Sequence, residues 1–299
     1  LEREGAHLEL ASAWRLIGLV HGVAARYGQA TDASSRYIAH ARLAGAEQLV
    51  ERSGLSQAMN VLLGPTPVPE AIVECERILG SGMADRLVQG IVMCTLAQLR
   101  AMQGEFEPAR RLISSGRSML RDLGEGVNAA STGVDLAYVE WLAGDLNTAE
   151  KELRADCDFL SRMGETFYLS SMAVRLARLV RDQGRDAEAL ELLDTASGAA
   201  APDDVDAQAS WRATRAPIVA RLGRTDEAFG LATEAIALAR QTEAPLLQAD
   251  SLAELAVVAE LAGRIDAARA TITQAIDLYF AKGNRVSAER CAAWAQRLG

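Results

Sequence analysis

One short pattern returns along this chain about every forty residues: a glycine followed, five positions later, by an alanine. It occurs as Gly28–Ala33, Gly104–Ala109, Gly144–Ala149, Gly184–Ala189, Gly223–Ala228 and Gly263–Ala268, and a version widened by three prolines, Gly64–Ala71, stands in the remaining gap. Five copies have a further alanine seven residues before the glycine: Ala97, Ala137, Ala177, Ala216 and Ala256. A fixed period of this length is typical of solenoid proteins.

The residues on both sides of Gly144 predict two helices that meet at this glycine. Apolar residues recur there at three- and four-residue steps, which is helical spacing. A glycine just past a helix end adopts the left-handed conformation without a Cβ penalty. Ala137 and Ala149 are small where the two helices of the hairpin would touch, and the residues at the contact set the distance between helix axes.

A second set of breakers separates one hairpin from the next: Gly45, Gly82, Gly124, Gly164, the stretch 198–206, Pro245 and Gly283. We therefore predict an all-α fold, a right-handed α-α superhelix of about seven hairpins that turn near residues 28, 64, 104, 144, 184, 223 and 263. A last helix over 285–298 would cap the array. Because the repeat is uninterrupted, residues 1–299 are expected to form a single repeat domain. The chain has no initiator methionine and its first residues lack a polar cap, so we expect a fragment of a longer polypeptide.

Composition excludes several classes of partner. The net charge of −9 and the pI near 5.0 disfavour nucleic acid, because a phosphate backbone would be repelled. No apolar stretch reaches the roughly eighteen residues of a membrane span, and the N-terminus is unlike a signal peptide, so no membrane association and a cytoplasmic location are expected. The four cysteines (Cys75, Cys94, Cys157 and Cys291) are widely spaced and are predicted to be small buried side chains.

The sequence offers no recognisable catalytic or cofactor motif, so no catalytic, cofactor-binding or metal-binding residue is predicted. The histidines His7, His21 and His40 have no second ligand one helical turn away. The acidic pair Asp203 and Asp204 is explained by helix capping.

Two features stand out from the regular pattern. Pro217 interrupts an otherwise helical run and predicts a kink or a late helix start. When units are aligned on their glycines, four residues fall on the face that should line the concave groove: Tyr138, Trp141, Arg178 and Arg181. Aromatic residues and arginines anchor many binding surfaces, which makes these four the candidate groove contacts. The alternative for Tyr138 and Trp141 is a place in the core.

The repeat unit resembles the tetratricopeptide repeat (TPR), most clearly at Gly104–Ala109 and Gly263–Ala268. The stretch from Trp14 through Gly18 to His21 is similar to the opening of that repeat, although it is several residues out of register with Gly28. The family's unit is about 34 residues long, so the longer period here implies longer helices.

A narrower resemblance lies in the Pro-widened stretch Gly64–Ala71 with its flanks. It is similar to the C-terminal repeat region of multidomain bacterial adenylate/guanylate cyclases, in which a cyclase domain and an AAA-type ATPase module precede the repeats. The resemblance implies a scaffold that binds a protein segment or small effector in its groove and regulates the attached cyclase and ATPase domains. It transfers no catalytic residue. The alternatives are the sensor repeat domain of an ATPase-linked transcriptional activator, an oligomerisation module, and an enzyme acting on a ligand in the groove.

Overall fold

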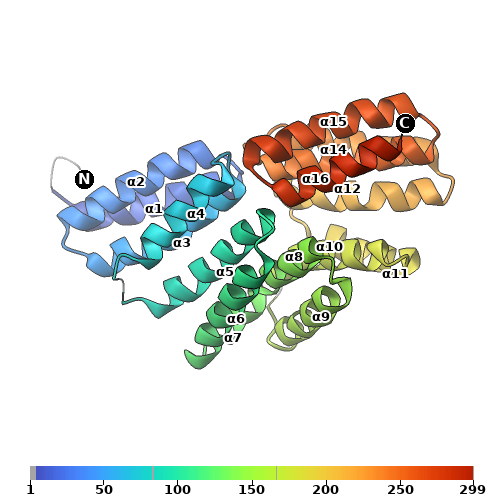
Figure 1. Cartoon of the computed structure of the whole chain (residues 1–299). Coiled ribbons are helices and arrows are strands. Elements are labelled where there is room, and N and C mark those ends of the chain that lie inside the picture. Colours follow the sequence, from blue (N-terminus) through green and yellow to red (C-terminus); the bar gives the residue numbers. More distant parts are fainter. Residues whose placement is uncertain (1–4, 83, 166, 299) are drawn as a thin grey trace.

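The computed structural model describes residues 5–82, 84–165 and 167–298, and within these residues the chain is helical throughout, with no strand. Its helices form seven antiparallel hairpins and a final helix (Figure 1). The hairpins are α1–α2 (His7–Val23, Tyr27–Leu43), α3–α4 (Glu47–Leu63, Val68–Leu79), α5–α6 (Arg86–Met102, Phe106–Asp122), α7/α8–α9 (Gly126–Ser131 and Gly133–Ala143, Leu146–Arg162), α10–α11 (Phe167–Asp182, Asp186–Ala199), α12–α13 (Val205–Arg221, Thr225–Ala239) and α14–α15 (Pro245–Leu261, Ile265–Lys282). Helix α16 (Arg285–Arg297) follows them. The predicted TPR-like array of seven hairpins with a capping helix is confirmed.

The repeated small residues do close the hairpins. The alanine before each turn and the alanine after it are fully buried in the five regular units: Ala97 and Ala109, Ala137 and Ala149, Ala177 and Ala189, Ala216 and Ala228, Ala256 and Ala268. The glycines between them, Gly104, Gly144, Gly184, Gly223 and Gly263, all have positive φ. A glycine is favoured there because other residues pay a steric penalty in the left-handed region.

The first turn lies at Ala25, so the predicted turn at Gly28 is wrong. Ala25 takes the left-handed conformation (φ 50°), while Gly28 is the second residue of α2. Ala25 thus occupies the place that glycine holds in the later units, and Ala30 follows five residues on, fully enclosed. Trp14 and Gly18 then fall in register with this turn. The TPR-like opening is therefore in register with the first turn, which lies at Ala25 and not at Gly28.

The Pro-widened turn has a different geometry from the others. Gly64 is extended (φ −77°, ψ −173°), and Pro67 caps the N-terminus of α4. A Cβ on Gly64 would lie 2.7 Å from the Cβ of Tyr27, which is too close for any side chain other than glycine's hydrogen. Gly64 is required here by the close approach of the Asn60 carbonyl oxygen of α3 and of Tyr27 of the first hairpin, and not by a positive φ.

Pro217 lies inside α12, which begins at Val205, so the helix does not start late. The residue is buried, and the carbonyl of the nearby Thr214 accepts a hydrogen bond from Arg181 Nη1 at 3.4 Å.

A helix interruption does occur in the fourth hairpin, between α7 and α8. There a Cβ on Gly133 would lie 2.3 Å from Asp156 Oδ2, and Asp156 forms a buried ion pair with Arg117 (Nη2 to Oδ2 2.7 Å).

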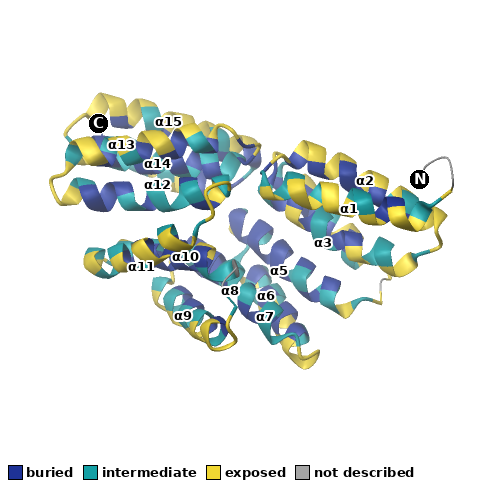
Figure 2. Cartoon of the chain, turned by 180° about the vertical axis from the view of Figure 1, so that it is seen from behind, coloured by how far each residue is buried: buried dark blue, intermediate teal, exposed yellow. Residues whose placement is uncertain are grey.

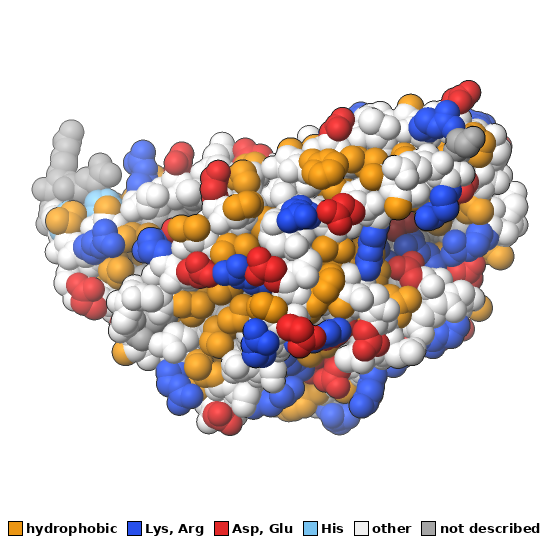
Figure 3. Space-filling view, in the orientation of Figure 1, with side chains coloured by type: hydrophobic (Ala, Val, Ile, Leu, Met, Phe, Trp, Pro, Cys, Tyr) orange, Lys and Arg blue, Asp and Glu red, His pale blue; other side chains and the backbone are white. Residues whose placement is uncertain are grey.

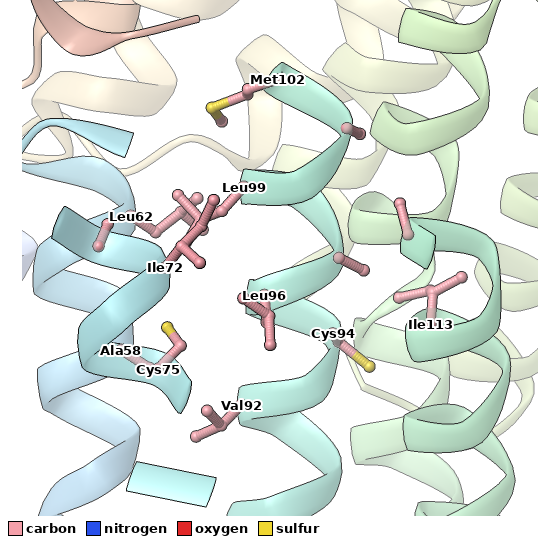
Figure 4. Packing of buried hydrophobic residues seen from close by; sticks show 14 of the residues in the cluster. Ala58, Leu62, Ile72, Cys75, Val92, Cys94, Leu96, Leu99, Met102 and Ile113 are labelled. Carbon is pink, nitrogen blue, oxygen red and sulfur yellow. The ribbon is translucent and has the colours of Figure 1, made fainter. Parts of the chain in front are cut away.

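Apolar clusters run through the array. The cluster in Figure 4 joins α3, α4, α5 and α6: Leu62 and Ile72 face Leu99, and Ile113 packs on the opposite side of α5. Cys75 and Cys94 belong to this cluster and are fully buried, as predicted, whereas Cys157 and Cys291 are half-buried. All four are free thiols. Within the described ranges, none of the helices combines the length and the hydropathy that crossing a bilayer requires.

The array curves until its two ends meet. Figures 1 and 2 both show helices α12–α16 beside the ends of α1–α4. Glu243, in the turn before α14, donates its backbone N–H to Ala25 O at 2.9 Å and accepts from Gly28 N at 2.6 Å. At the other side of the closure, Gln103 Nε2 donates to Gly283 O at 2.6 Å. The C-terminal hairpins therefore lie against the first three hairpins.

Candidate functional site

The four predicted groove residues lie together on α8 and α10, the first helices of neighbouring hairpins. The rings of Tyr138 and Trp141 stack with centroids 5.9 Å apart, and the Arg178 guanidinium lies 4.4 Å from the centroid of Trp141. Trp141 Nε1 donates to Asp182 Oδ2 at 3.0 Å, and Asp182 Oδ1 accepts from Arg181. Alignment on the turn glycines therefore identified side chains that meet in space.

Both arginines form ion pairs with α14. Arg178 Nη1 donates to Asp250 Oδ2 at 2.8 Å, and Arg181 Nη1 donates to Glu254 Oε2 at 2.8 Å. Asp250 and Glu254 are one helical turn apart, so they match the spacing of the two arginines on α10. Burial by itself would lower the pKa of Arg178, but Asp250 and Glu254 outweigh it and raise that pKa. The two guanidinium groups are held as cations.

Asp250 also joins α14 to α15. It accepts a short hydrogen bond from the Tyr279 hydroxyl, and the Tyr279 side chain is almost fully buried. Burial, followed by the nearby Asp250 carboxylate, raises the pKa of Tyr279. Tyr279 is a neutral donor, and it fixes the carboxylate that faces Arg178.

Helix α16 contacts the aromatic pair from the other side. Asn284, which caps α16, donates from Nδ2 to the Tyr138 hydroxyl at 3.0 Å. Arg290 donates to two carbonyls at the end of α8, those of Trp141 (3.2 Å) and Leu142 (2.7 Å), and its guanidinium lies 5.4 Å from the Trp141 ring. Trp141 thus has cation–π contacts with both Arg178 and Arg290. We call these residues of α8, α10, α14, α15 and α16 the inner cluster: Tyr138, Trp141, Arg178, Arg181, Asp182, Asp250, Glu254, Tyr279, Asn284 and Arg290.

A titratable group lies one turn before Tyr138. Asp135 accepts a short hydrogen bond from Gln98 of α5, and burial raises the pKa of Asp135 to about 7. Arg175 of α10, with its guanidinium 5.3 Å from the Tyr138 ring, opposes this rise. This carboxyl changes charge near neutral pH, beside the aromatic pair.

The sequence predicted four of the ten residues of the inner cluster, and it missed the cluster residue Glu254 and the neighbouring Asp135 and Arg175. Asp135, Arg175 and Glu254 each stand nine residues before a turn glycine, one turn earlier on the same face as the four predicted residues. Their shared position relative to the turn glycines is the sequence signal that marks them. Asp250, Tyr279 and Arg290 carry no such signal, because they reach the cluster through the closure of the array.

The remaining candidates do not form sites. His7 and His40 meet with Nδ1 atoms 3.1 Å apart and rings stacked, a contact across 33 positions that sequence spacing did not predict. Among the described residues, no group of three or more His, Cys, Asp or Glu side chains is arranged to hold a metal ion. Two surface grooves, of about 280 and 470 Å³, are lined by residues outside the inner cluster. On the face in Figure 3, basic and acidic side chains are interspersed.

Comparison with known proteins gives the fold. No model of a known protein family matches the sequence, and no curated protein matches it. Among solved structures, BtubC (BKLC) of P. vanneervenii superposes with a TM-score of 0.50 at 17% identity, covering 72% of this chain and 89% of that one. A Signal Transduction ATPase with Numerous Domains (STAND) protein with a tetratricopeptide repeat sensor, from Pyrococcus horikoshii, superposes with a TM-score of 0.55 at 12% identity over 94% of this chain. This chain spans 46% of that structure. At such identities the likeness establishes a TPR-like helical repeat fold.

Proposed function

We propose that this chain is a non-catalytic scaffold whose inner cluster binds a protein segment or small effector and relays its presence to attached signalling domains. The proposal rests on the contacts of Trp141 and Arg178. They form a surface of the kind that anchors protein ligands, and the chain's own α14 and α16 occupy it. Solenoid arrays commonly bind ligands along their inner surfaces.

The occupied state defines the chemistry of the ligand. Arg178 and Arg181 are paired with two carboxylates spaced one helical turn apart, those of Asp250 and Glu254. A competing ligand must supply acidic groups in their place, since an arginine stripped of its partner in a buried setting is strongly unfavourable. An acidic segment that replaced α14 would change how the C-terminal hairpins lie against the rest of the array. That change is the signal an attached domain would receive.

Two kinds of parent protein suit this role. The resemblance of Gly64–Ala71 favours a bacterial adenylate/guanylate cyclase. The superposition with the STAND protein over most of this chain favours the alternative, a sensor domain of an ATPase-linked regulator. Both place the repeats as a sensor, and they differ in the domain that responds.

Selection from a displayed library of random peptides tests the binding role. We expect peptides enriched in Asp and Glu to bind the wild-type chain, and to lose at least about tenfold in affinity on Arg178→Ala or Trp141→Ala. Arg162→Ala, at an exposed position on α9, is the matched control and should leave binding unchanged. Equal binding by Arg178→Ala and wild type would rule out the inner cluster as the site. Cyclisation or hydrolysis of ATP by the purified chain would overturn the non-catalytic assignment.

A further inference from the structure

The Pro-widened turn presents three backbone carbonyls to a single point. The oxygens of Val61, Gly64 and Thr66 lie 2.8, 2.7 and 2.6 Å from the Nζ atom of Lys282. Lys282 is the last residue of α15 and is buried, so these oxygens replace water around its ammonium group. Figure 1 shows the end of α15 beside the turn that joins α3 to α4. We call the three carbonyls the carbonyl site.

The sequence of the turn explains why these carbonyls are free to accept. In a continuing α-helix the carbonyl of Val61 would accept from the N–H of residue 65, but Pro65 has no N–H. Val61 also lies in the last turn of α3, where unpaired carbonyls give the helix end a partial negative charge that favours a cation. Gly64 and Thr66 lie between α3 and α4, outside both helices. The ammonium therefore supplies donors that the backbone here does not.

The carbonyl site is held in place by contacts that do not involve Lys282. Each of the three prolines between Gly64 and Ala71 fixes a φ angle, so the turn has few accessible conformations. Gly64 also packs against Tyr27 of the first hairpin so closely that no Cβ fits between them. The site is therefore built by α2, α3 and the turn, and the ammonium is a ligand that α15 brings to it.

The geometry selects a primary ammonium among cations. An ammonium carries three N–H donors on one atom, which equals the number of converging carbonyls, whereas the donors of a guanidinium are spread over a planar fork. Ca²⁺ and Mg²⁺ take about six to eight oxygen ligands, more than the carbonyl site offers. Among the residues that the structure describes, no carboxylate pairs with Lys282, so the site is neutral and suits a single positive charge.

The residues that follow Lys282 connect the carbonyl site to the inner cluster. Gly283 ends α15 with a φ of 86°, and its carbonyl accepts from Gln103. Asn284 caps α16 and donates to the Tyr138 hydroxyl. Helices on the two sides of this closure pack far less extensively on each other than neighbouring hairpins do, so these polar contacts are a large part of what holds it. Release of Lys282 would therefore loosen the start of α16 at Tyr138.

We propose that the carbonyls of Val61, Gly64 and Thr66 form a binding site for a primary alkylammonium group, which Lys282 fills from within the chain. An alkylammonium group from outside the chain competes for the same carbonyls and releases the end of α15. The carbonyl site does not depend on ligand binding at the inner cluster, so each proposal can fail without the other.

Chemical rescue of a truncated variant tests the carbonyl site. Lys282→Ala removes the propyl chain and the ammonium beyond Cβ, and propylammonium chloride supplies the same atoms. At saturation it should raise the melting temperature of this variant by about 2 °C or more, because a ligand that binds only the folded state stabilises it. Lys151→Ala, at an exposed position of α9, is the control and should not respond. Tetramethylammonium and K⁺ at the same ionic strength lack N–H donors and should give no rescue.

The wild-type chain gives a second measurement that does not depend on the folding of a variant. With ¹⁵N-labelled lysine, only Lys151 and Lys282 give ammonium signals. At about pH 6 the hydrogens of Lys282 should exchange with water at least about tenfold more slowly than those of Lys151, because exchange requires the closure to open. Propylammonium should speed the exchange of Lys282, and tetramethylammonium should not.

Three outcomes overturn the proposal. The first is a Lys282→Ala variant that shows no saturable response to propylammonium, or that tetramethylammonium or K⁺ rescues equally well. The second is equal exchange of the two lysine ammonium groups in the wild-type chain. The third is an exchange rate of Lys282 that propylammonium leaves unchanged, since this would exclude competition for the carbonyl site.

Discussion

Lys282, at the end of α15, donates a hydrogen bond from Nζ to the carbonyl oxygen of Gly64 at 2.7 Å, across 218 positions of sequence. The same ammonium reaches Val61 O at 2.8 Å and Thr66 O at 2.6 Å, and its side chain is 1% exposed. Burial lowers the pKa of Lys282 to about 8, and three carbonyls replace the water that the ammonium has lost. This contact joins the last hairpin to the Pro-widened turn of the second.

The chain uses lysine at only two positions, Lys151 and Lys282, among 31 basic residues. At residue 282 the choice has a physical reason. An ammonium donates three hydrogen bonds from one compact atom, whereas the planar guanidinium of arginine spreads its donors over a fork. The three carbonyls converge on one point, which suits the ammonium.

Lys282→Met should therefore destabilise the chain by about 2 to 3 kcal/mol, because it leaves buried carbonyls without donors. Lys282→Arg should not restore the loss. Lys151→Met, at an exposed position of α9, is the matched control and should change stability by no more than about 0.5 kcal/mol. Urea denaturation measures all three, and a Lys282→Met variant as stable as the control would contradict the contact's structural role.

The closure predicts unequal reactivity of the two lysines. An amine-directed acylating reagent should modify exposed Lys151 quickly and enclosed Lys282 only when the array opens. Arg178→Met breaks one of the ion pairs that hold α14 and should speed modification of Lys282 relative to Lys151. Mass spectrometry of the two modified peptides gives the ratio. Equal rates in the wild-type chain would mean that the ends are not held together in solution.

Arg178 and Asp250 form a partly buried pair whose coupling can be measured. Arg178→Met should cost about 1 to 2 kcal/mol, since it leaves the Asp250 carboxylate facing α10 without its cation. Adding Asp250→Asn removes that charge, so the double variant should be more stable than the sum of the two single losses predicts. A double-mutant cycle by denaturant unfolding provides the coupling free energy. Strict additivity would contradict a direct interaction.

Asp135 links stability to pH. Its pKa is about 7 in the folded chain and 3.8 is its ordinary value, so between these pH values the folded state binds more protons than the unfolded state. The contribution of Asp135 to stability therefore falls as pH rises from about 4 to about 7. Asp135→Asn keeps the shape of the neutral acid, and it should flatten this part of the pH profile and raise the melting temperature at about pH 8. Asp158→Asn, at an exposed position on α9, should leave the profile unchanged.

Two glycines inside helices should respond to alanine with opposite signs. A Cβ on Gly116 would lie 2.5 Å from Gly90 O and 2.9 Å from Cys94 Sγ, where α6 crosses α5. Gly116→Ala should force the hairpin apart and cost about 2 kcal/mol. A Cβ on Gly230 in α13 meets nothing within 4 Å. Gly230→Ala should stabilise by about 1 kcal/mol, because alanine is the better helix former. Thermal unfolding of both variants gives the comparison.

Much of the fold could be predicted because its signals are local. Gly144, Ala137 and Ala149 indicate a hairpin on their own, since a turn and a helix contact each require a particular residue size within a few positions. The prediction failed at the first turn because Ala25 there does what glycine does elsewhere, and Gly28 offered a nearby glycine with another role. A single glycine in a helix looks the same in sequence as a glycine in a turn.

The residues of the inner cluster also fall into two groups, those with a local sequence signal and those without one. Tyr138, Trp141, Arg178 and Arg181 could be placed on one face because they share a position relative to successive turns. One hairpin separates Arg178 from its partner Asp250, three hairpins separate Trp141 from its partner Arg290, and no local pattern connects either pair.

The periodic glycines and alanines were enough to predict the helical hairpins and their order, apart from the position of the first turn, because these depend on spacing over one or two turns of helix. The closure of the array depends on a small rotation at every hairpin junction, summed along the chain, and no local pattern encodes such a sum. That closure brings Lys282 to Gly64 and α14 to Arg178. As a result, the surface formed by Trp141 and Arg178 is covered by α14 and α16 of the same chain.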